Sequence, residues 1–125
     1  MKLNAVGVAS SDLKKTLEFY ELLGFDFPEL KDEKHIEAIN GENQIKLMID
    51  SEEIIEGIIG EKPRPGNHSM FAIEYENPSE VDKIVKGVKE KGFTVVKEPW
   101  DAVWGQRYAI VSDPDGYKVD LYAFL

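Results

Sequence analysis

The side chains of this 125-residue chain that could do acid–base chemistry are few. Two histidines are present and cysteine is absent, so the chain offers neither a thiolate nucleophile nor a cysteine metal site. Glu74 and Asp120 stand in alternating apolar stretches, and a carboxyl group on such a strand can act as a general acid or base. His68 lies two residues before Met70, so both are expected on one strand face with Glu74. His35 is flanked by charged residues and is expected on the surface.

A second group of side chains that could bind a ligand is aromatic. Trp100 and Trp104 fall in a predicted loop, and Tyr108, Tyr122 and Phe124 fall on the last two predicted strands. Indole rings stack on planar molecules and attract cations. Core packing or a contact between subunits would use the same residue types, so three roles stay open for the two tryptophans.

The stretch 104–121 predicts two strands joined by a tight Asp-Pro-Asp-Gly turn. Gly116 supplies the positive φ that such a turn requires, and the proline fixes φ at its entry. Arg107 is expected to anchor the turn through one of its carboxylates, Asp113 or Asp115.

The elements that must position these groups follow one plan twice. Each half predicts a strand, a helix and three further strands, with a Gly-Phe pair after each helix, at Gly24 and Gly92. The second helix is expected to begin with a capping box of Ser79 and Asp82. The predicted strands cover residues 3–9, 25–27, 34–40 and 44–50 in the first half, and 69–75, 93–97, 107–112 and 117–124 in the second.

We therefore expect an α+β fold of two βαβββ modules in one domain. Module 1 covers about residues 1–60, a linker about 61–67 and module 2 about 68–125. Since one module cannot cover its own sheet, two modules are expected to pair into a curved sheet with helices outside and a concave cleft inside. The modules could pair within one chain or be exchanged between two chains.

One segment breaks the symmetry of the two halves. Residues 51–60 carry four isoleucines among glutamates, which predicts a short amphipathic helix. A packing helix, a lid over the cleft and a contact between subunits are its three possible roles.

The composition is that of a globular protein, and the charge limits its partners. The net charge is −9, with 7 basic against 14 acidic residues in 1–62 and 8 against 10 in 63–125. Nucleic acids and anionic membranes bind basic surfaces, so neither is an expected partner. The acidic balance either keeps the protein soluble or attracts a cationic ligand. No apolar run approaches the about 20 residues that span a bilayer, and a cytoplasmic location is expected.

Two motifs resemble a known family. The opening Asp-Leu-x-x-x-Leu-x-Phe-Tyr followed by Leu-Gly-Phe covers residues 12–25, and the close Trp-Gly-x-Arg followed by Asp-Pro-Asp-Gly-Tyr covers residues 104–117. Together with the repeated module they resemble the vicinal oxygen chelate superfamily. Its members include glyoxalase I, extradiol dioxygenases, fosfomycin-resistance enzymes and bleomycin-resistance binding proteins. The resemblance implies the fold and a homodimer, and it leaves the reaction open.

The resemblance also implies where a metal would bind, and this chain departs from the pattern there. The four ligand positions of glyoxalase-type members fall on Ala5, Lys46, Met70 and Asp120. Only Asp120 offers a ligand that divalent ions favour. We therefore expect no metal and no other cofactor, and the resemblance implies that Lys46 and Asp120 meet as an ion pair instead. A displaced site formed by His68, Glu74 and Asp120 is the alternative.

The predicted function is that of a metal-independent small-molecule binding protein of the bleomycin-resistance type. Its ligand, a cationic or aromatic molecule, would lie in an acidic, aromatic-lined cleft. The alternatives are a glyoxalase-type lyase or isomerase with an atypical site, and a regulatory module whose cleft is filled by large side chains. The candidate ligand-binding residues are Lys46, Met48, His68, Met70, Glu74, Trp100, Trp104, Tyr108, Asp120 and Tyr122.

Overall fold

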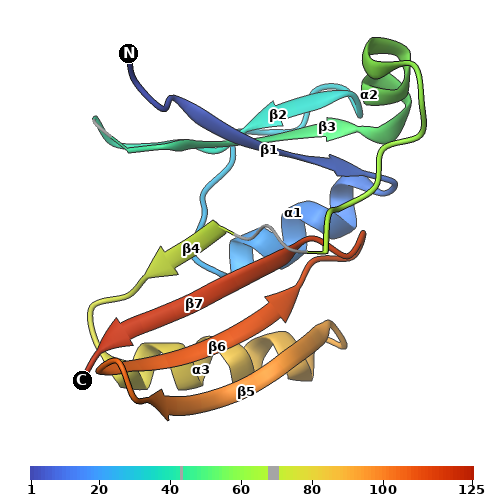
Figure 1. The fold of residues 1–125 in the computed structure, drawn as a ribbon. Helices are drawn as coiled ribbons and strands as arrows, with labels where there is room; N and C mark the ends of the chain where they lie inside the picture. The colour runs from blue at the N-terminus through green and yellow to red at the C-terminus, as the bar shows by residue number, and fades with distance from the viewer. Residues whose placement is uncertain (43, 68–70) are drawn as a thin grey trace. The chain divides into compact units, whose positions relative to one another are not determined.

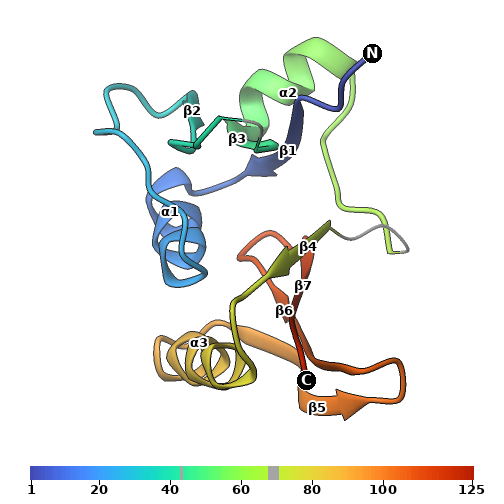
Figure 2. The ribbon, with the colours of Figure 1, turned by 90° about the vertical axis from the view of Figure 1, so that its left-hand side faces the viewer.

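The computed structural model describes residues 1–42, 44–67 and 71–125. The chain divides into two compact units, Met1–Arg64 and Pro65–Leu125, and the division falls inside the linker expected from the sequence. Figures 1 and 2 show the elements of each unit. The described strands hydrogen-bond into two sheets, one in each unit. The fold is α+β, as predicted, while the pairing of the two sheets into one curved surface stays a prediction.

The first unit contains a three-stranded sheet, called sheet A below, and two helices. Its elements are β1 (Ala5–Ser10), α1 (Leu13–Leu22), β2 (His35–Glu37), β3 (Lys46–Ser51) and α2 (Glu52–Ile59). The strand order is β1-β3-β2, with β1 parallel and β2 antiparallel to β3. Helix α1 begins where the Asp12 side chain accepts a hydrogen bond from the backbone N–H of Lys15, and Gly24 follows its end with φ +108°.

The predicted strand at residues 25–27 is not formed. Phe25 and Phe27 instead pack ring against ring, with centroids 6.4 Å apart, and Phe25 also contacts Tyr20. One backbone hydrogen bond, from Ile39 N–H to the Asp26 carbonyl, ties this segment to the chain that follows β2. Pro28 has no N–H to continue a ladder, so the segment packs by its side chains rather than by strand pairing.

The second unit contains a four-stranded sheet, called sheet B below, and one long helix. Its elements are β4 (Phe71–Glu74), α3 (Pro78–Glu90), β5 (Thr94–Ala102), β6 (Gln106–Ser112) and β7 (Lys118–Phe124). The strand order is β4-β7-β6-β5, with β4 parallel to β7 and the other pairs antiparallel. Both units therefore place their first strand parallel to their last one, which matches the predicted repetition.

Helix α3 covers one face of sheet B. Its apolar stripe of Val81, Val85 and Val88 is buried, as are Val119 and Leu121 of β7. Figure 2 shows the helix beside the sheet. The helix is capped by Asn77, whose side chain accepts from Glu80 N–H, rather than by the predicted Ser79 capping box. Pro78 at the first helical position leaves the preceding residue extended, which is the conformation of an N-cap.

The predicted hairpin is present, but its arginine has a different role. The Asp113 carboxylate accepts from the backbone N–H groups of Asp115 and Tyr117, and Gly116 has φ +96°. Arg107 instead forms ion pairs with Asp82 of α3 and Asp101 of β5. Six residues of extended strand, about 20 Å, separate Arg107 from Asp113, so the arginine cannot reach the turn.

The helix predicted at residues 51–60 is formed as α2. Ser51 caps it by accepting from Ile54 N–H, and Gly60 ends it with φ +83°. None of its residues is buried, and Ile58 and Ile59 are exposed. Its role stays open. No helix in the described part of the chain is long and apolar enough to cross a membrane.

Candidate functional site

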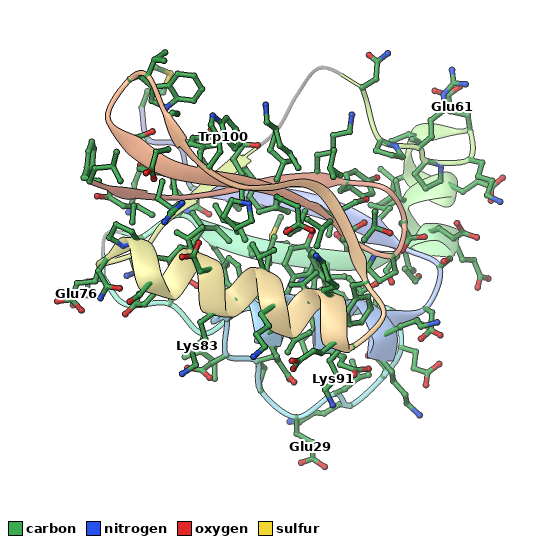
Figure 3. The ribbon with its side chains drawn as sticks, turned by 90° about the horizontal axis from the view of Figure 1, so that it is seen from below. Glu29, Glu61, Glu76, Lys83, Lys91 and Trp100 are labelled. Atoms are coloured by element: carbon green, nitrogen blue, oxygen red, sulfur yellow. The ribbon has the colours of Figure 1, made fainter. Side chains whose placement is uncertain are left out.

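Sheet B has two faces, and Arg107 shows which of them α3 covers. Because Arg107 and Asp101 contact each other and Arg107 reaches Asp82, both lie on the α3 side. Side chains alternate along a strand, so Tyr108 lies on the opposite side. The strand register pairs Tyr108 with Trp100 and with Tyr122. We call the side of sheet B opposite to α3 the aromatic face, and Figure 3 shows Trp100 there.

The predicted aromatic residues form one continuous cluster on this face. Trp100 contacts Trp104 and Tyr108 edge to face, with ring centroids 6.0 and 5.4 Å apart. Tyr108 stacks on Tyr122 at 5.9 Å, and Tyr122 contacts Phe124 edge to face. Aromatic rings in these arrangements stabilise one another, so the cluster is a firm surface against which a planar molecule can lie.

Trp100 is not in a loop, as the sequence suggested, but within β5. The strand extends to Ala102, five residues beyond its predicted end at 97. Trp104 does lie in the β5–β6 connection, where its indole N–H donates to the Gln106 side chain at 2.9 Å. Trp104 is 58% exposed.

Each of the two predicted carboxylates on the aromatic face accepts a tyrosine hydroxyl. Tyr108 donates to Oδ2 of Asp120 at 2.5 Å, and Tyr122 donates to Oε2 of Glu74 at 3.4 Å. Asp120 is 9% exposed, yet its second oxygen, Oδ1, has no hydrogen-bond partner among the described residues. A buried carboxylate oxygen without a donor is costly, so Oδ1 would gain stability from a hydrogen bond. Because the atom itself is buried, a bound molecule can donate to it only when a neighbouring side chain moves aside.

The two tyrosines are held in their neutral, donating form. Burial raises the pKa of Tyr108 well above its usual value, and the hydrogen bond to Asp120 raises it further. Burial also raises the pKa of Tyr122, with a contribution from the charge of Glu74. Both phenols therefore stay protonated near neutral pH and remain hydrogen-bond donors.

A second polar cluster, which the sequence analysis did not find, lies on one face of sheet A. His35 Nδ1 lies 2.5 Å from Asp50 Oδ1 and its Nε2 lies 2.9 Å from Glu37 Oε2, while the other Glu37 oxygen lies 2.8 Å from Lys46 Nζ. The His35 side chain is 43% exposed, in line with its predicted surface position. The register between β2 and β3 brings this cluster together, because His35 pairs with Asp50 and Glu37 pairs with Met48. Strand pairing between distant segments cannot be read from local sequence.

A sequence model of the Glyoxalase/Bleomycin resistance protein/Dioxygenase superfamily matches residues 2–121. The chain belongs to this superfamily. Solved structures of the superfamily share its fold. A family enzyme from Burkholderia phytofirmans superposes with a TM-score of 0.84 at 18% identity, covering 100% of both chains. A hypothetical protein from S. aureus superposes with a TM-score of 0.82 at 24% identity, covering 98% of this chain and 94% of the other.

A lactoylglutathione lyase from Agrobacterium tumefaciens also superposes, with a TM-score of 0.71 at 15% identity, covering 98% of this chain and 92% of the other. No curated protein matches the chain. At these identities the superfamily structures establish the fold and leave the activity of this chain open.

The superfamily's metal is a poor fit to the residues that the structure describes. Ala5 has no ligand atom, and Lys46, a cation, is engaged by Glu37. Asp120 offers one carboxylate, already bonded to Tyr108. Within residues 1–42, 44–67 and 71–125, no three His, Cys, Asp or Glu side chains are grouped so that they could hold a metal ion. His68 and Met70 lie outside the described residues, so the displaced site with Glu74 is not tested.

The other predicted site residues are distributed over both units. Lys46 and Met48 share a face of sheet A, since they are two residues apart on β3. The predicted ion pair between Lys46 and Asp120 would join the two units and stays a prediction. Each has a partner within its own unit, Glu37 for Lys46 and Tyr108 for Asp120.

A surface hollow of about 430 Å³ lies elsewhere in the first unit. It is formed by α1 and the segment that precedes β2, and none of the candidate ligand-binding residues lines it. Its lining residues are Lys14, Leu17, Glu18, Glu21, Leu30, Lys31, Asp32 and Glu33. These are mostly long, solvated side chains, so the aromatic face is the stronger candidate for a ligand site.

Proposed function

We propose that this superfamily member is a metal-independent small-molecule binding protein, and that its ligand is a planar organic cation with an N–H donor. The observation that carries the proposal is the buried, unpartnered Oδ1 of Asp120 beside a continuous aromatic cluster. An ammonium group would donate to Oδ1, and an aromatic ring attached to it would lie against Trp100 or Tyr108. Binding of this kind requires no catalytic group.

The acceptors of the aromatic face, rather than its net charge, support a cation. Asp120 and Glu74 supply carboxylates there, and the tyrosines that bind them are neutral donors. Lys97 and Lys118 lie on the same face and balance the two negative charges. The whole chain carries a net charge of −9, so the long-range field also attracts cations. We further propose the homodimer and the cytoplasmic location that the resemblance and the composition suggested.

The direct test is a titration with benzylamine, which is a benzylammonium cation at neutral pH, followed by tryptophan fluorescence. We expect benzylammonium to bind more tightly than neutral benzyl alcohol, because a charged N–H group forms a stronger hydrogen bond with the Asp120 carboxylate than a neutral hydroxyl does. The variant Asp120→Asn should bind benzylammonium about tenfold or more weakly, the usual cost of losing a charge-assisted hydrogen bond.

The matched control is Glu76→Gln, which removes the same charge beside the start of α3, where Glu76 lies in Figure 3. It should leave the affinity for benzylammonium unchanged. Equal affinity for benzylammonium and benzyl alcohol, or no effect of Asp120→Asn, would overturn the proposal.

A glyoxalase-type lyase or isomerase with an atypical site is the second candidate. The observation that favours it is the hydrogen bond between Tyr108 and Asp120, since a neutral phenol can donate a proton while a carboxylate accepts one. A lactoylglutathione lyase also shares the fold. This candidate predicts turnover of a hemithioacetal that disappears in Asp120→Asn, and binding without turnover would exclude it.

A further inference from the structure

Strand β5 lies at the edge of sheet B and is irregular near Trp100. Its pairing with β6 shifts register twice, between Val95 and Lys97 and again between Lys97 and Trp100. Pro99 lies within the second irregular stretch, where an edge strand tolerates a residue without an N–H. Shifts of this kind are β-bulges, which change the direction of the side chains that follow.

The second shift decides on which face Trp100 lies. Glu98 forms an ion pair with Lys89 of α3, so Glu98 lies on the α3 side. In a regular strand Trp100, two residues later, would lie on that same side. It lies instead on the aromatic face with Tyr108. The bulge therefore brings Trp100 to the same side as Lys97, although the two residues are three positions apart in the chain.

As a result, the ammonium group of Lys97 already lies over the indole ring of Trp100. Its Nζ lies 4.1 Å from the centroid of Trp100, within the range of a cation–π interaction. Among the described residues Lys97 forms no ion pair with a carboxylate, and its ammonium group contacts the indole ring of Trp100. The position where an organic cation would be attracted to Trp100 is thus filled by a cation of the chain itself.

We propose that Lys97 is a built-in competitor that determines which cations this face accepts. This inference rests on the proposed function, because it concerns the same aromatic face. A ligand cation that approaches the face of the Trp100 ring covered by Lys97 must displace the Lys97 ammonium, which then moves away on its flexible stem into water. A weakly attracted cation fails to displace it, so Lys97 lowers the affinity for every cation and excludes the weakest ones.

The test uses benzyltrimethylammonium, a permanent cation without an N–H group, so that attraction to the rings and not the hydrogen bond to Asp120 is measured. Titrations monitored by tryptophan fluorescence would compare the wild-type protein with Lys97→Met, which keeps most of the apolar stem and removes the ammonium. We expect Lys97→Met to bind this probe about three- to tenfold more tightly, as a cation–π contact of ordinary strength implies.

The matched control is Lys83→Met, which makes the same change of net charge on α3, where Figure 3 labels Lys83. It should leave the affinity for the probe unchanged. A general effect of the lost positive charge would instead tighten binding in both variants. In a Trp100→Phe background, Lys97→Met should have a smaller effect, since the benzene ring attracts cations less than the indole does.

The outcomes separate this inference from the proposed function. Tighter binding by Lys97→Met, or binding that only this variant shows, supports both. If the wild-type protein binds the probe and Lys97→Met binds it equally or more weakly, Lys97 is no competitor while the proposed function stands. If none of the folded proteins binds the probe, and none binds benzylammonium, both proposals are wrong.

Discussion

Asp113 and Asp120 are both buried aspartates on or beside the last hairpin, yet their surroundings differ. Asp113 has one oxygen that accepts two backbone N–H groups within its turn. Asp120 shares one oxygen with a tyrosine hydroxyl, and its other oxygen has no partner among the described residues. The first carboxylate stabilises a loop, whereas the second keeps a buried oxygen for which the described residues provide no donor. The same residue type therefore has a structural role at one position and a candidate binding role seven residues later.

The structural role of Asp113 predicts a loss of stability on truncation. Asp113→Ala leaves the N–H groups of Asp115 and Tyr117 without their acceptor, so we expect the free energy of unfolding to fall by about 1–3 kcal/mol. Urea unfolding followed by circular dichroism would measure this. The control Asp26→Ala alters an exposed aspartate and should change the free energy by less than about 0.5 kcal/mol. Equal effects of the two variants would contradict the assignment.

At the scale of elements, short β2 is joined to β3 by side chains as well as by backbone. His35 is the centre of this link, with Glu37 on its own strand and Asp50 and Lys46 from β3. The facing residues of β1, which are Ala5, Gly7 and Ala9, carry no charge. The hydrogen bond with Glu37 and then that with Asp50 raise the pKa of His35 above its ordinary value of 6.5.

The raised pKa of His35 predicts a pH-dependent stability. Since the folded protein binds the imidazole proton more tightly than the unfolded chain, the stabilisation is complete below about pH 6.5 and is lost as the pH rises through the raised pKa. The NMR titration of the His35 ring should have its midpoint above that of an unperturbed histidine, and Asp50→Asn should lower it. His35→Gln should reduce the dependence of stability on pH in this range. A midpoint at or below the ordinary value would contradict the network.

At the scale of the whole chain, the same order of elements occurs twice, but the two units carry different chemistry. Sheet A presents the charged network of His35, Glu37, Asp50 and Lys46, whereas sheet B presents aromatic rings with two carboxylates. The two units therefore follow the same order of elements but carry side chains of different chemistry on their sheets. Because the metal-ligand positions that the resemblance implies include Ala5 and Lys46, the usual metal chemistry of the superfamily has no support in the described residues.

The expected result is that divalent metals do not stabilise the protein. Thermal unfolding with added nickel, zinc, manganese or cobalt should give the same midpoint as unfolding without metal, because only ligands that bind the native state raise it. Metal content measured after purification without an affinity tag should be well below one ion per chain. Near one ion per chain, lost in His68→Ala or Asp120→Asn, would contradict metal independence and favour the enzyme.

Local sequence determined the features of this protein that depend on neighbouring residues. The Asp-Pro-Asp-Gly turn, the glycine that follows the first helix at Gly24 and the amphipathic helix at residues 51–60 were all predicted, because each depends on backbone conformation within a few residues. Register and packing between distant segments were decided only by the tertiary structure. A bulge in β5 places Trp100 on the aromatic face. Arg107 forms an ion pair with Asp82 of α3 rather than with the turn, and Glu37 forms an ion pair with Lys46. A strand exposes its side chains to whatever the rest of the chain places beside it, and that neighbour is set by the energy of the whole fold.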